Sequence, residues 1–300
     1  MNDLNIKSNN IKKELENLND KGKSLSKINL ENKNLSKINL INGHISNSNL
    51  SKINFKDASL FGINLNGSNL FKANFEGANL NNANLKNCNL LGVNLTNTKL
   101  KNVKWDDNFT VKNEIEADFL MKKNDYKNAL IKYKEAEDIY RTLKISMQSQ
   151  TLGYETGEFF IREMIVKRKQ LNKLSARRLG SKIIEITTGY GERLKNIFFT
   201  MLSIILVCMF LYGIEGVKYS DPIHGDRIIS FFNEDINNYG ILNTIGNLFY
   251  FSVVVYSTVG FGEIIPIGPI GKTVMIFEGI IGGLVLAILI IALYKKSMDR

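Results

Sequence analysis

A large apolar residue recurs at every fifth position through much of the first third of the chain, and this spacing restricts the folds open to it. The series is unbroken and runs Leu30, Leu35, Leu40, Ile45, Leu50, Phe55, Leu60, Leu65, Leu70, Phe75, Leu80, Leu85, Leu90, Leu95, Leu100. A period of five fits neither the 3.6-residue period of a helix nor the two-residue period of a strand. It fits a coil with four short faces, so the segment predicts a solenoid.

A second series of small or medium apolar residues lies two places before the large ones, as at Ile53, Ala58, Ile63, Ala73, Ala78, Ala83, Cys88 and Val93. Together the two series resemble the pentapeptide-repeat family. The resemblance implies a right-handed quadrilateral β-helix over residues 25–105 that turns once per twenty residues, with both series inside. We expect about four coils stacked at roughly 4.8 Å, preceded by a polar N-terminal segment, residues 1–24.

The charge of this segment bears on its partners. Residues 25–105 hold ten lysines against three acidic residues, a net charge of +7, and no arginine. An excess of base argues against mimicry of DNA, and the arginines and outward aromatics that usually bind nucleic acid are missing. We therefore expect no nucleic-acid partner. A scaffold or regulatory module is the default, with a cytosolic protein or anionic lipid headgroups as possible contacts.

Residues 111–180 show a helical pattern of small and aromatic residues: Tyr126, Ala129, Tyr133, Ala136 and Tyr140. The run "NDYKNALIKYKEAEDIY" resembles part of a tetratricopeptide repeat. That implies one or two cytosolic α-helical hairpins, which we expect to couple the solenoid to the rest of the chain or to recruit a partner. The aromatic stripe is expected to be core.

Three apolar segments occupy the C-terminal third. Residues 197–214 and 270–294 are long enough to cross a bilayer, whereas residues 242–256 fall short of the roughly 20 residues that a crossing needs. The short segment suits a re-entrant pore helix, because its backbone hydrogen bonds are satisfied internally. Residues 197–294 thus predict an all-α two-transmembrane pore with a re-entrant loop, joined to the cytosolic part by a juxtamembrane linker, residues 181–196. The chain as a whole is expected to be multi-domain.

Between the short segment and the last one lie Thr258, Val259, Gly260, Phe261 and Gly262. A loop can line up backbone carbonyls around an ion only if alternate residues adopt dihedrals that L-residues resist, and the two glycines meet that need. The motif "STVGFGE", from Ser257 to Glu263, resembles the selectivity filter of the potassium-channel superfamily.

This resemblance implies a homotetrameric two-transmembrane potassium channel. The carbonyls of Thr258, Val259, Gly260 and Phe261 would bind potassium, the Thr258 hydroxyl would complete the inner ion site, and Gly262 would permit the turn. Potassium held by these carbonyls is the only metal expected, and no cofactor is implied.

Two departures from the family pattern leave alternatives open. Glu263 stands where aspartate is usual, and Phe261 replaces the more frequent tyrosine. The pore could therefore be a poorly selective cation channel. A different alternative is a membrane-anchored pentapeptide-repeat scaffold with a vestigial pore.

Two residues of the last apolar segment are singled out. Gly282 lies twenty residues beyond Gly262, where resembling channels place a glycine that lets the inner helix bend, although a small residue there could equally serve close packing. Glu278 is a carboxylate in mid-membrane, which is costly unless it faces water or a partner, or is protonated. It could line the cavity, brace the rear of the filter, or be a protonated packing residue.

Charge placement predicts the orientation. Basic residues flank the cytosolic ends of both crossings: Arg177, Arg178, Lys182, Arg193, Lys195, Lys295, Lys296 and Arg300. By the positive-inside rule both termini face the cytosol, in a plasma-membrane protein that crosses twice. The N-terminus is polar, with no signal peptide. The loop of residues 215–240 has five acidic residues against two basic ones, so it should attract cations mildly, although these could equally be solvated loop charges. The acidic residues are Glu215, Asp221, Asp226, Glu234 and Asp235, and the basic ones are Lys218 and Arg227.

Several features of the sequence argue against a disulfide, an enzyme and a second filter. Cys88 and Cys208 lie in different domains and predict no disulfide. His44 and His224 are isolated, and no nucleophile has a base nearby, so no enzyme is expected. Residues 187–192, "TTGYGE", imitate a filter but have no pore helix before them, so they predict a juxtamembrane turn.

Overall fold

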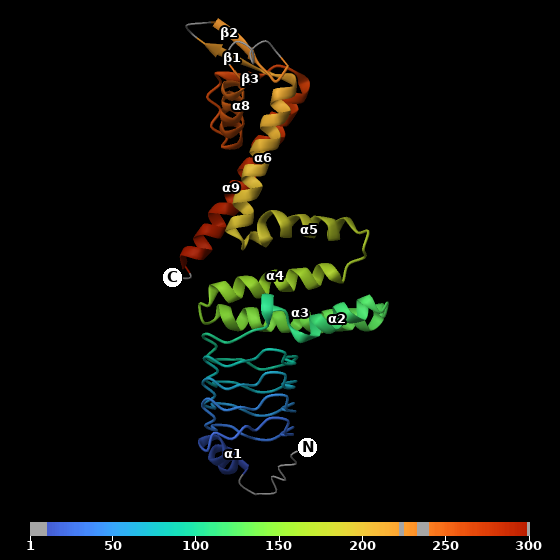
Figure 1. Ribbon diagram of the computed structural model, residues 1–300, viewed down its shortest axis with the longest axis vertical. Coiled ribbons are helices and arrows are strands. Elements are labelled where there is room, and N and C mark those ends of the chain that lie inside the picture. The colour runs from blue at the N-terminus through green and yellow to red at the C-terminus, as the bar shows by residue number, and fades with distance from the viewer. Residues whose placement is uncertain (1–10, 222–224, 233–239, 299–300) are drawn as a thin grey trace. The chain divides into compact units, whose positions relative to one another are not determined.

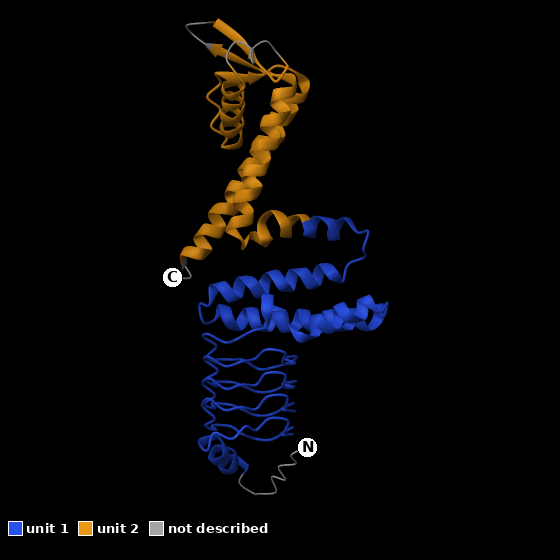
Figure 2. Ribbon diagram, in the orientation of Figure 1, with its two compact units in different colours: residues 1–182, 299 blue, residues 183–298, 300 orange. Residues whose placement is uncertain are grey.

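The structure is a computed structural model that describes residues 11–221, 225–232 and 240–298. It contains two compact units, residues 1–182 and 183–298 (Figures 1 and 2), and each is described by itself. His224, Glu234, Asp235 and Arg300, named above, lie outside the described residues.

The repeats of unit 1 form coils of twenty residues. Parallel bridges join residues twenty apart, from Asn29 with Asn49 to Asn84 with Lys104. Each face turns at a residue with positive φ, as at Asn32, Asp57 and Gly77, and these recur every five positions. Because asparagine, aspartate and glycine tolerate this conformation best, their frequency here has a steric cause.

Asparagine side chains also link the coils. The amide of Asn54 donates to Asn34 at 3.0 Å, Asn74 donates to Asn54 at 3.3 Å, and Asn94 donates to Asn74 at 3.0 Å. Such a ladder forms only when the coils stack in one register. The repeated asparagine therefore fixes the register that the inner leucines alone leave open.

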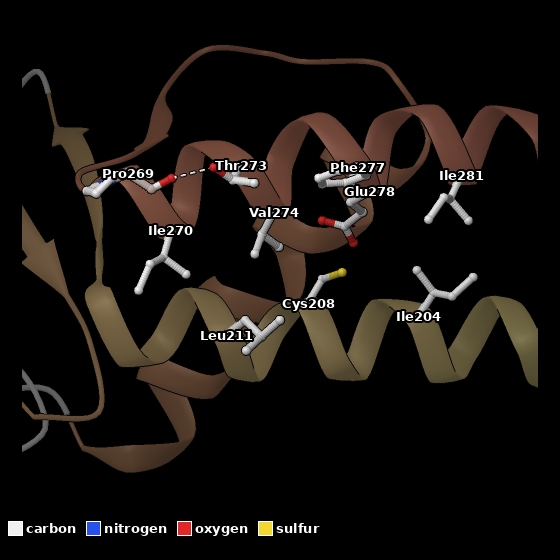
Figure 3. A pocket seen from close by; sticks show the side chains of 10 residues that line it. All are labelled: Ile204, Cys208, Leu211, Pro269, Ile270, Thr273, Val274, Phe277, Glu278 and Ile281. Atoms are coloured by element: carbon white, nitrogen blue, oxygen red, sulfur yellow. Dashed lines mark hydrogen bonds between the residues drawn. The ribbon is translucent and has the colours of Figure 1, made fainter.

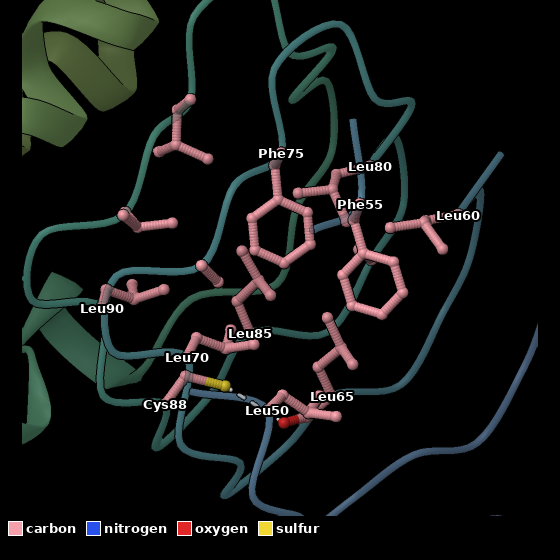
Figure 4. Packing of buried hydrophobic residues seen from close by; sticks show 14 of the residues in the cluster. Leu50, Phe55, Leu60, Leu65, Leu70, Phe75, Leu80, Leu85, Cys88 and Leu90 are labelled. Atoms are coloured by element: carbon pink, nitrogen blue, oxygen red, sulfur yellow. Dashed lines mark hydrogen bonds between the residues drawn. The ribbon is translucent and has the colours of Figure 1, made fainter. Parts of the chain in front are cut away.

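The interior of the coils is apolar and closely packed (Figure 4). The rings of Phe55 and Phe75, one coil apart, stack with centroids 5.4 Å apart. Cys88 is buried, and its thiol donates to the Leu65 carbonyl at 3.1 Å. Burial raises the pKa of the Cys88 thiol to about 12, so it stays protonated and unreactive.

Helices cover both ends of the solenoid, where the stacked backbone would otherwise lack partners. Helix α1, Ile11–Asp20, places Leu15 in the same core as the first coils, and Glu16 accepts the backbone N–H of Asn39 at 2.9 Å. The segment of residues 1–24, expected only to be polar, thus includes a capping helix. The sequence did not predict this helix, because its apolar pattern consists of little more than Leu15 and its neighbours.

At the other end lie η1, Asp107–Phe109, and helices α2, Lys112–Lys122, α3, Tyr126–Gln148, and α4, Gly153–Lys169. Trp105 of the last coil meets Phe159 of α4 edge to face at 5.2 Å, and the Leu100 N–H donates to Gln150 at 2.9 Å. The solenoid and these helices therefore share one core.

The aromatic stripe of α3 is only partly core. Tyr133 and Tyr140 are buried, and Tyr140 donates to the fully buried Glu114 at 2.5 Å. Arg162 and Lys169 of α4 also bind Glu114, at 2.9 and 2.8 Å. Tyr126 is about half exposed, so its expected core position is wrong. It begins the helix, beyond the stretch that α4 covers.

Helix α5, Ala176–Thr188, runs across the boundary between the units, and a turn, η2, Gly189–Gly191, follows it. The sequence placed the start of the juxtamembrane linker at residue 181, which lies inside this helix. Residues 187–192 form the end of α5 and this turn, with Tyr190 at φ 57°.

Unit 2 contains α6, Leu194–Glu215, α8, Ile241–Tyr256, and α9, Pro269–Met298. Helices α6 and α9 are long and apolar enough to cross a membrane. Each spans the predicted crossing with a few residues added at its ends. Helix α8 is shorter and packs against both.

The prediction that unit 2 is all-α is wrong. Strands β1, Val217–Asp221, β2, Gly225–Ile229, and β3, Ile264–Pro266, form an antiparallel sheet in the order β2-β1-β3 (Figure 1). Val217 pairs with both Ile229 and Pro266, and its side chain is buried. The sheet ties the chain after α6 to the chain after the predicted filter. Its strands are too short for their alternation to be visible in the sequence.

Candidate functional site

The pore helix of the prediction, α8, ends in a hydrogen-bonded turn that leads straight into the filter segment. The Thr258 N–H donates to the Val255 carbonyl at 3.0 Å, and the Val259 N–H donates to the Val254 carbonyl at 3.2 Å. This pair of bonds, with Thr258 at φ 58°, is the Schellman motif that closes many helices. A β-branched residue resists that φ, so the first filter residue is held in a strained conformation.

Along residues 258–262, positions with positive φ alternate with positions without it. Thr258, Gly260 and Gly262 have φ of 58°, 60° and 84°, whereas Val259 and Phe261 between them do not have positive φ. This is the alternation that a row of carbonyls along one side of a loop requires. Thr258 takes the third such position, which the sequence had assigned to the glycines alone.

The segment is exposed within the single chain. Val259 and Phe261 are 55% and 68% exposed, and a Cβ built on Gly260 or Gly262 would meet no atom within 4 Å. Two large apolar side chains on an open loop are unfavourable in water unless another surface covers them. The loop therefore presents apolar side chains that the described part of the chain leaves uncovered.

Side chains at both ends of the loop bond to nearby groups. Ser257 Oγ donates to the Val254 carbonyl at 3.2 Å, and Thr258 Oγ1 donates to the Ser257 carbonyl at 2.7 Å. At the far end, the Tyr250 hydroxyl of α8 donates to the Glu263 carboxylate. The Glu263 carbonyl also accepts the Ser220 N–H of β1 at 3.0 Å. The longer Glu263 side chain is thus held by the pore helix, a contact that the sequence did not reveal.

Glu278 is buried where α6, α8 and α9 meet, and it borders a cleft between α6 and α9 (Figure 3). Its Oε2 accepts the Tyr212 hydroxyl of α6 at 2.7 Å, and its Oε1 lies 2.5 Å from Ser252 Oγ of α8. The carboxyl group therefore connects all three helices from inside the protomer.

The two contacts of the Ser252 hydroxyl bear on whether Glu278 is protonated. Ser252 Oγ lies 2.9 Å from the Ile205 carbonyl as well as 2.5 Å from Glu278. A hydroxyl carries one proton, and a carbonyl can only accept. Ser252 Oγ donates to both acceptors only if the two share its one proton in a three-centre bond; if the contacts are two separate hydrogen bonds, Glu278 carries a proton and donates it to Ser252. This arrangement fits the protonated packing residue and a brace behind the filter better than it fits a side chain in an open cavity.

Gly282 lies one turn further along α9, against the end of the pore helix. A Cβ at this position would overlap the Tyr256 carbonyl oxygen, whereas a Cβ at Gly283 would meet nothing within 4 Å. Helix α9 is continuous across both glycines. The absence of a side chain at Gly282 therefore has a packing cause, beside any role in bending.

A further carboxylate was predicted only as a loop charge. Glu215, the last residue of α6, accepts the Gly271 N–H at the start of α9 at 2.6 Å. The first N–H groups of a helix lack internal partners and attract negative charge. Asp226 also has a partner, Lys218 at 2.5 Å. Of the described loop acids, these two are engaged in the structure, which weakens the expected attraction of cations.

The described part of the chain contains no group of three or more His, Cys, Asp or Glu residues that could hold a metal ion. The loop of residues 258–262 lies beside the short helix α8 and the two membrane-length helices, and its function is the remaining question.

Comparison with known families decides its class. A family model described as "Ion channel" matches residues 227–296, which include α8, the loop and all but the end of α9. A second family, "Pentapeptide repeats", matches residues 63–102 in eight copies. The chain carries a pentapeptide-repeat domain and an ion-channel domain.

Similar solved structures cover the pentapeptide-repeat domain. A pentapeptide repeat protein (Rfr23) from the cyanobacterium Cyanothece 51142 is 46% identical over 28% of this chain and 58% of that one, with a TM-score of 0.28. The match thus spans less than two thirds of that protein. A pentapeptide repeat protein from Nostoc Pcc 7120 is 22% identical over 31% of this chain and 94% of that one, with a TM-score of 0.21. No curated protein matches the chain.

The ion-channel match begins within β2 and leaves α6 outside it. Helix α6 nevertheless packs against α8 and α9 and supplies Tyr212 to Glu278. The ion-channel domain of this protein is thus completed by a helix that the family match does not include.

Proposed function

We propose that the protein is a homotetrameric, potassium-selective channel of the plasma membrane. The observation that carries the proposal is the alternating backbone of Thr258, Val259, Gly260, Phe261 and Gly262 at the end of a short apolar helix. The carbonyls of the first four residues replace the water around a potassium ion. The C-terminal end of α8, which carries the negative end of the helix dipole, favours a cation there.

The geometry of the loop supports a tetramer. One loop supplies a single row of carbonyls, and a ring of four rows is needed to surround an ion. The exposed side chains of Val259 and Phe261 are the surfaces that neighbouring protomers cover. Glu263, held by Tyr250, braces the outer end of each row.

Both termini face the cytosol in this proposal, because the basic residues gather at the start of α6 and the end of α9. The pentapeptide-repeat domain then lies in the cytosol as a scaffold or regulatory module, where it contacts a protein partner rather than nucleic acid. The protein needs no cofactor and is not an enzyme. Glu278 braces the pore helix, and Gly282 lets α9 pass close to it.

Ion flux tests the proposal. Purified protein in potassium-loaded liposomes is compared with Gly260→Ala, which places a side chain at φ 60°, and with Gly246→Ala. Gly246 lies in α8 with nothing within 4 Å of its Cβ position, so it controls for an added methyl group. We expect potassium flux in the wild type and in Gly246→Ala, and its loss in Gly260→Ala.

Two other outcomes would identify the alternatives. Equal fluxes of sodium and potassium would favour a poorly selective cation channel. An unchanged flux in Gly260→Ala would contradict conduction through the filter, whereas the absence of any flux at varied pH and membrane tension would favour an anchored scaffold.

A further inference from the structure

Helix α5 has two unlike faces. At about 100° per residue, the apolar side chains of Leu179, Ile183, Ile184 and Ile186 fall on an arc of roughly 160°, together with Ala176, Gly180 and the polar Thr187. These four side chains are 65%, 52%, 48% and 62% exposed. An exposed apolar stripe of this length on a helix calls for an apolar surrounding.

The charged residues of α5 are arranged around that stripe. Arg177 falls at one edge of the apolar arc, next to Ile184, and Lys182 falls at the other edge, next to Ile186. Ser181, Glu185 and Arg178 occupy the opposite face, where Arg178 donates to the Leu171 carbonyl at 2.8 Å. Long basic side chains at the edges of an apolar face can reach phosphate groups while the face itself sits among acyl chains.

The end of α5 is fixed to the start of the first crossing. Thr200 Oγ1 of α6 donates to the Thr187 carbonyl at 2.7 Å, and Asn196 Nδ2 donates to the Ile186 carbonyl at 3.1 Å. These bonds satisfy carbonyls that the helix itself leaves without partners. The last turns of α5 run across the direction of α6 and belong to the same unit (Figure 2).

We propose that α5 is an interfacial helix that lies in the cytosolic surface of the membrane and binds anionic phospholipid. Its apolar face enters the boundary between headgroups and acyl chains, and Arg177 and Lys182 contact lipid phosphates on either side. Charge decides the partner, because a zwitterionic surface offers these cations no net attraction. The proposal depends on α6 crossing the membrane and not on ion conduction.

The depth of α5 is measured on full-length protein reconstituted in vesicles. A fluorescent probe is attached at Ile183→Cys or, as the matched control, at Ser181→Cys, in a Cys208→Ser background with Cys88 buried. We expect lipid-borne nitroxide to quench the probe at 183 and aqueous iodide to quench the probe at 181. Equal access of iodide to both probes would overturn the proposal, as would protection of residue 183 from both quenchers, which would indicate a protein partner.

The choice of lipid is measured with the probe at Ile183→Cys and brominated lipids. We expect brominated phosphatidylglycerol to quench it more strongly than brominated phosphatidylcholine. The double variant Arg177→Gln, Lys182→Gln should lower that preference about fivefold for each charge removed. Lys122→Gln with Lys127→Gln, exposed lysines of unit 1, removes the same charge and should leave it unchanged.

Ionic strength provides a second measurement that needs no variant. Salt at 1 M shortens the screening length to about 3 Å, so it should reduce the preference for phosphatidylglycerol in the wild type. A preference that is absent from the start, or that survives both salt and the double variant, would contradict binding through Arg177 and Lys182.

Discussion

At the scale of single residues, the most informative group is Glu278. An ionised carboxylate buried among membrane helices is expensive, whereas a protonated one can both donate and accept. The two hydroxyls at 2.7 and 2.5 Å, with the Ile205 carbonyl beyond Ser252, match the protonated form. Glu278 is then a neutral link between the helices.

A pair of substitutions tests this reading of Glu278. Glutamine can accept from Tyr212 and donate to Ser252, so Glu278→Gln should keep the thermal stability of the detergent-solubilised protein. Glu278→Ala leaves both hydroxyls without that partner and should cost about 2 kcal/mol or more. If Glu278→Gln is as destabilising as Glu278→Ala, the ionised form is required. If it leaves conductance, rectification and pH dependence unchanged, Glu278 has a packing role only.

Glu163 gives a prediction of pH dependence in unit 1. This side chain is 2% exposed and binds Lys144 and Lys167, each at 2.7 Å. Burial alone would raise the pKa of Glu163, but the hydrogen bonds from the two lysines outweigh it and hold the pKa below its ordinary value. A lowered folded-state pKa stabilises the fold above the unfolded value of about 4.3, and this stability is lost as the pH falls through the folded value.

Glu163→Gln should therefore lower the free energy of unfolding of unit 1 by about 2 kcal/mol at neutral pH. The difference from wild type should shrink as the pH falls below about 4. Urea denaturation followed by Trp105 fluorescence measures it, since the only tryptophan of the chain packs on α4. Glu155→Gln on the same helix is the control. A difference that does not change with pH would exclude the ion pairs as its source.

At the scale of elements, the contact of α9 with the end of α8 matters most for the pore. Gly282→Ala would drive a methyl group into the Tyr256 carbonyl, two residues before the filter segment. We expect lower tetramer stability and lower potassium flux. Gly283→Ala adds the same methyl group to open space and, by helix propensity, should stabilise α9 by up to about 1 kcal/mol.

A comparison of Gly282→Ala with Gly283→Ala distinguishes a packing role of Gly282 from a bending role. Loss of both stability and flux in Gly282→Ala alone supports the packing role. A shift in open probability with unchanged stability would instead support a hinge at Gly282. Equal effects of the two substitutions would contradict the contact seen in the structure.

The elements show which parts of the fold can be predicted from sequence. Helices α6, α8 and α9 lie within a few residues of their expected limits. The apolar runs of α6 and α9 end at charges or at Gly-Pro, and that of α8 lies between Gly240 and Ser257. The antiparallel sheet could not be predicted, since its strands are three to five residues long and Val217 pairs with Pro266, which lies far along the chain. The contacts of Glu215 and Glu263 depend on residues far along the chain, and no local spacing indicates them.

At the scale of the whole molecule, the core of unit 1 determines where the chain can be cut. Removal of residues 1–110 would separate the modules if the solenoid were independent. In the structure, however, Trp105 and Phe109 both pack on Phe159 of α4. That cut would expose the apolar surface of the remaining helices.

Removal of residues 1–174 takes away most of unit 1 but keeps α5, the helix that runs across the boundary between the units. We expect this variant to assemble as a tetramer and conduct potassium, whereas removal of residues 1–110 should give an aggregating protein. Size-exclusion chromatography and flux measure both. Assembly of the shorter deletion together with failure of the longer one would show that unit 2 depends on α2–α4.

The central claim is that four copies of the Thr258 to Gly262 loop form a filter that prefers potassium. The most direct measurement is the reversal potential across a planar bilayer with potassium on one side and sodium on the other. The account predicts a reversal potential displaced toward the potassium equilibrium potential and abolition of the current in Gly260→Ala. A current that reverses near zero, or one that persists in Gly260→Ala, would contradict it.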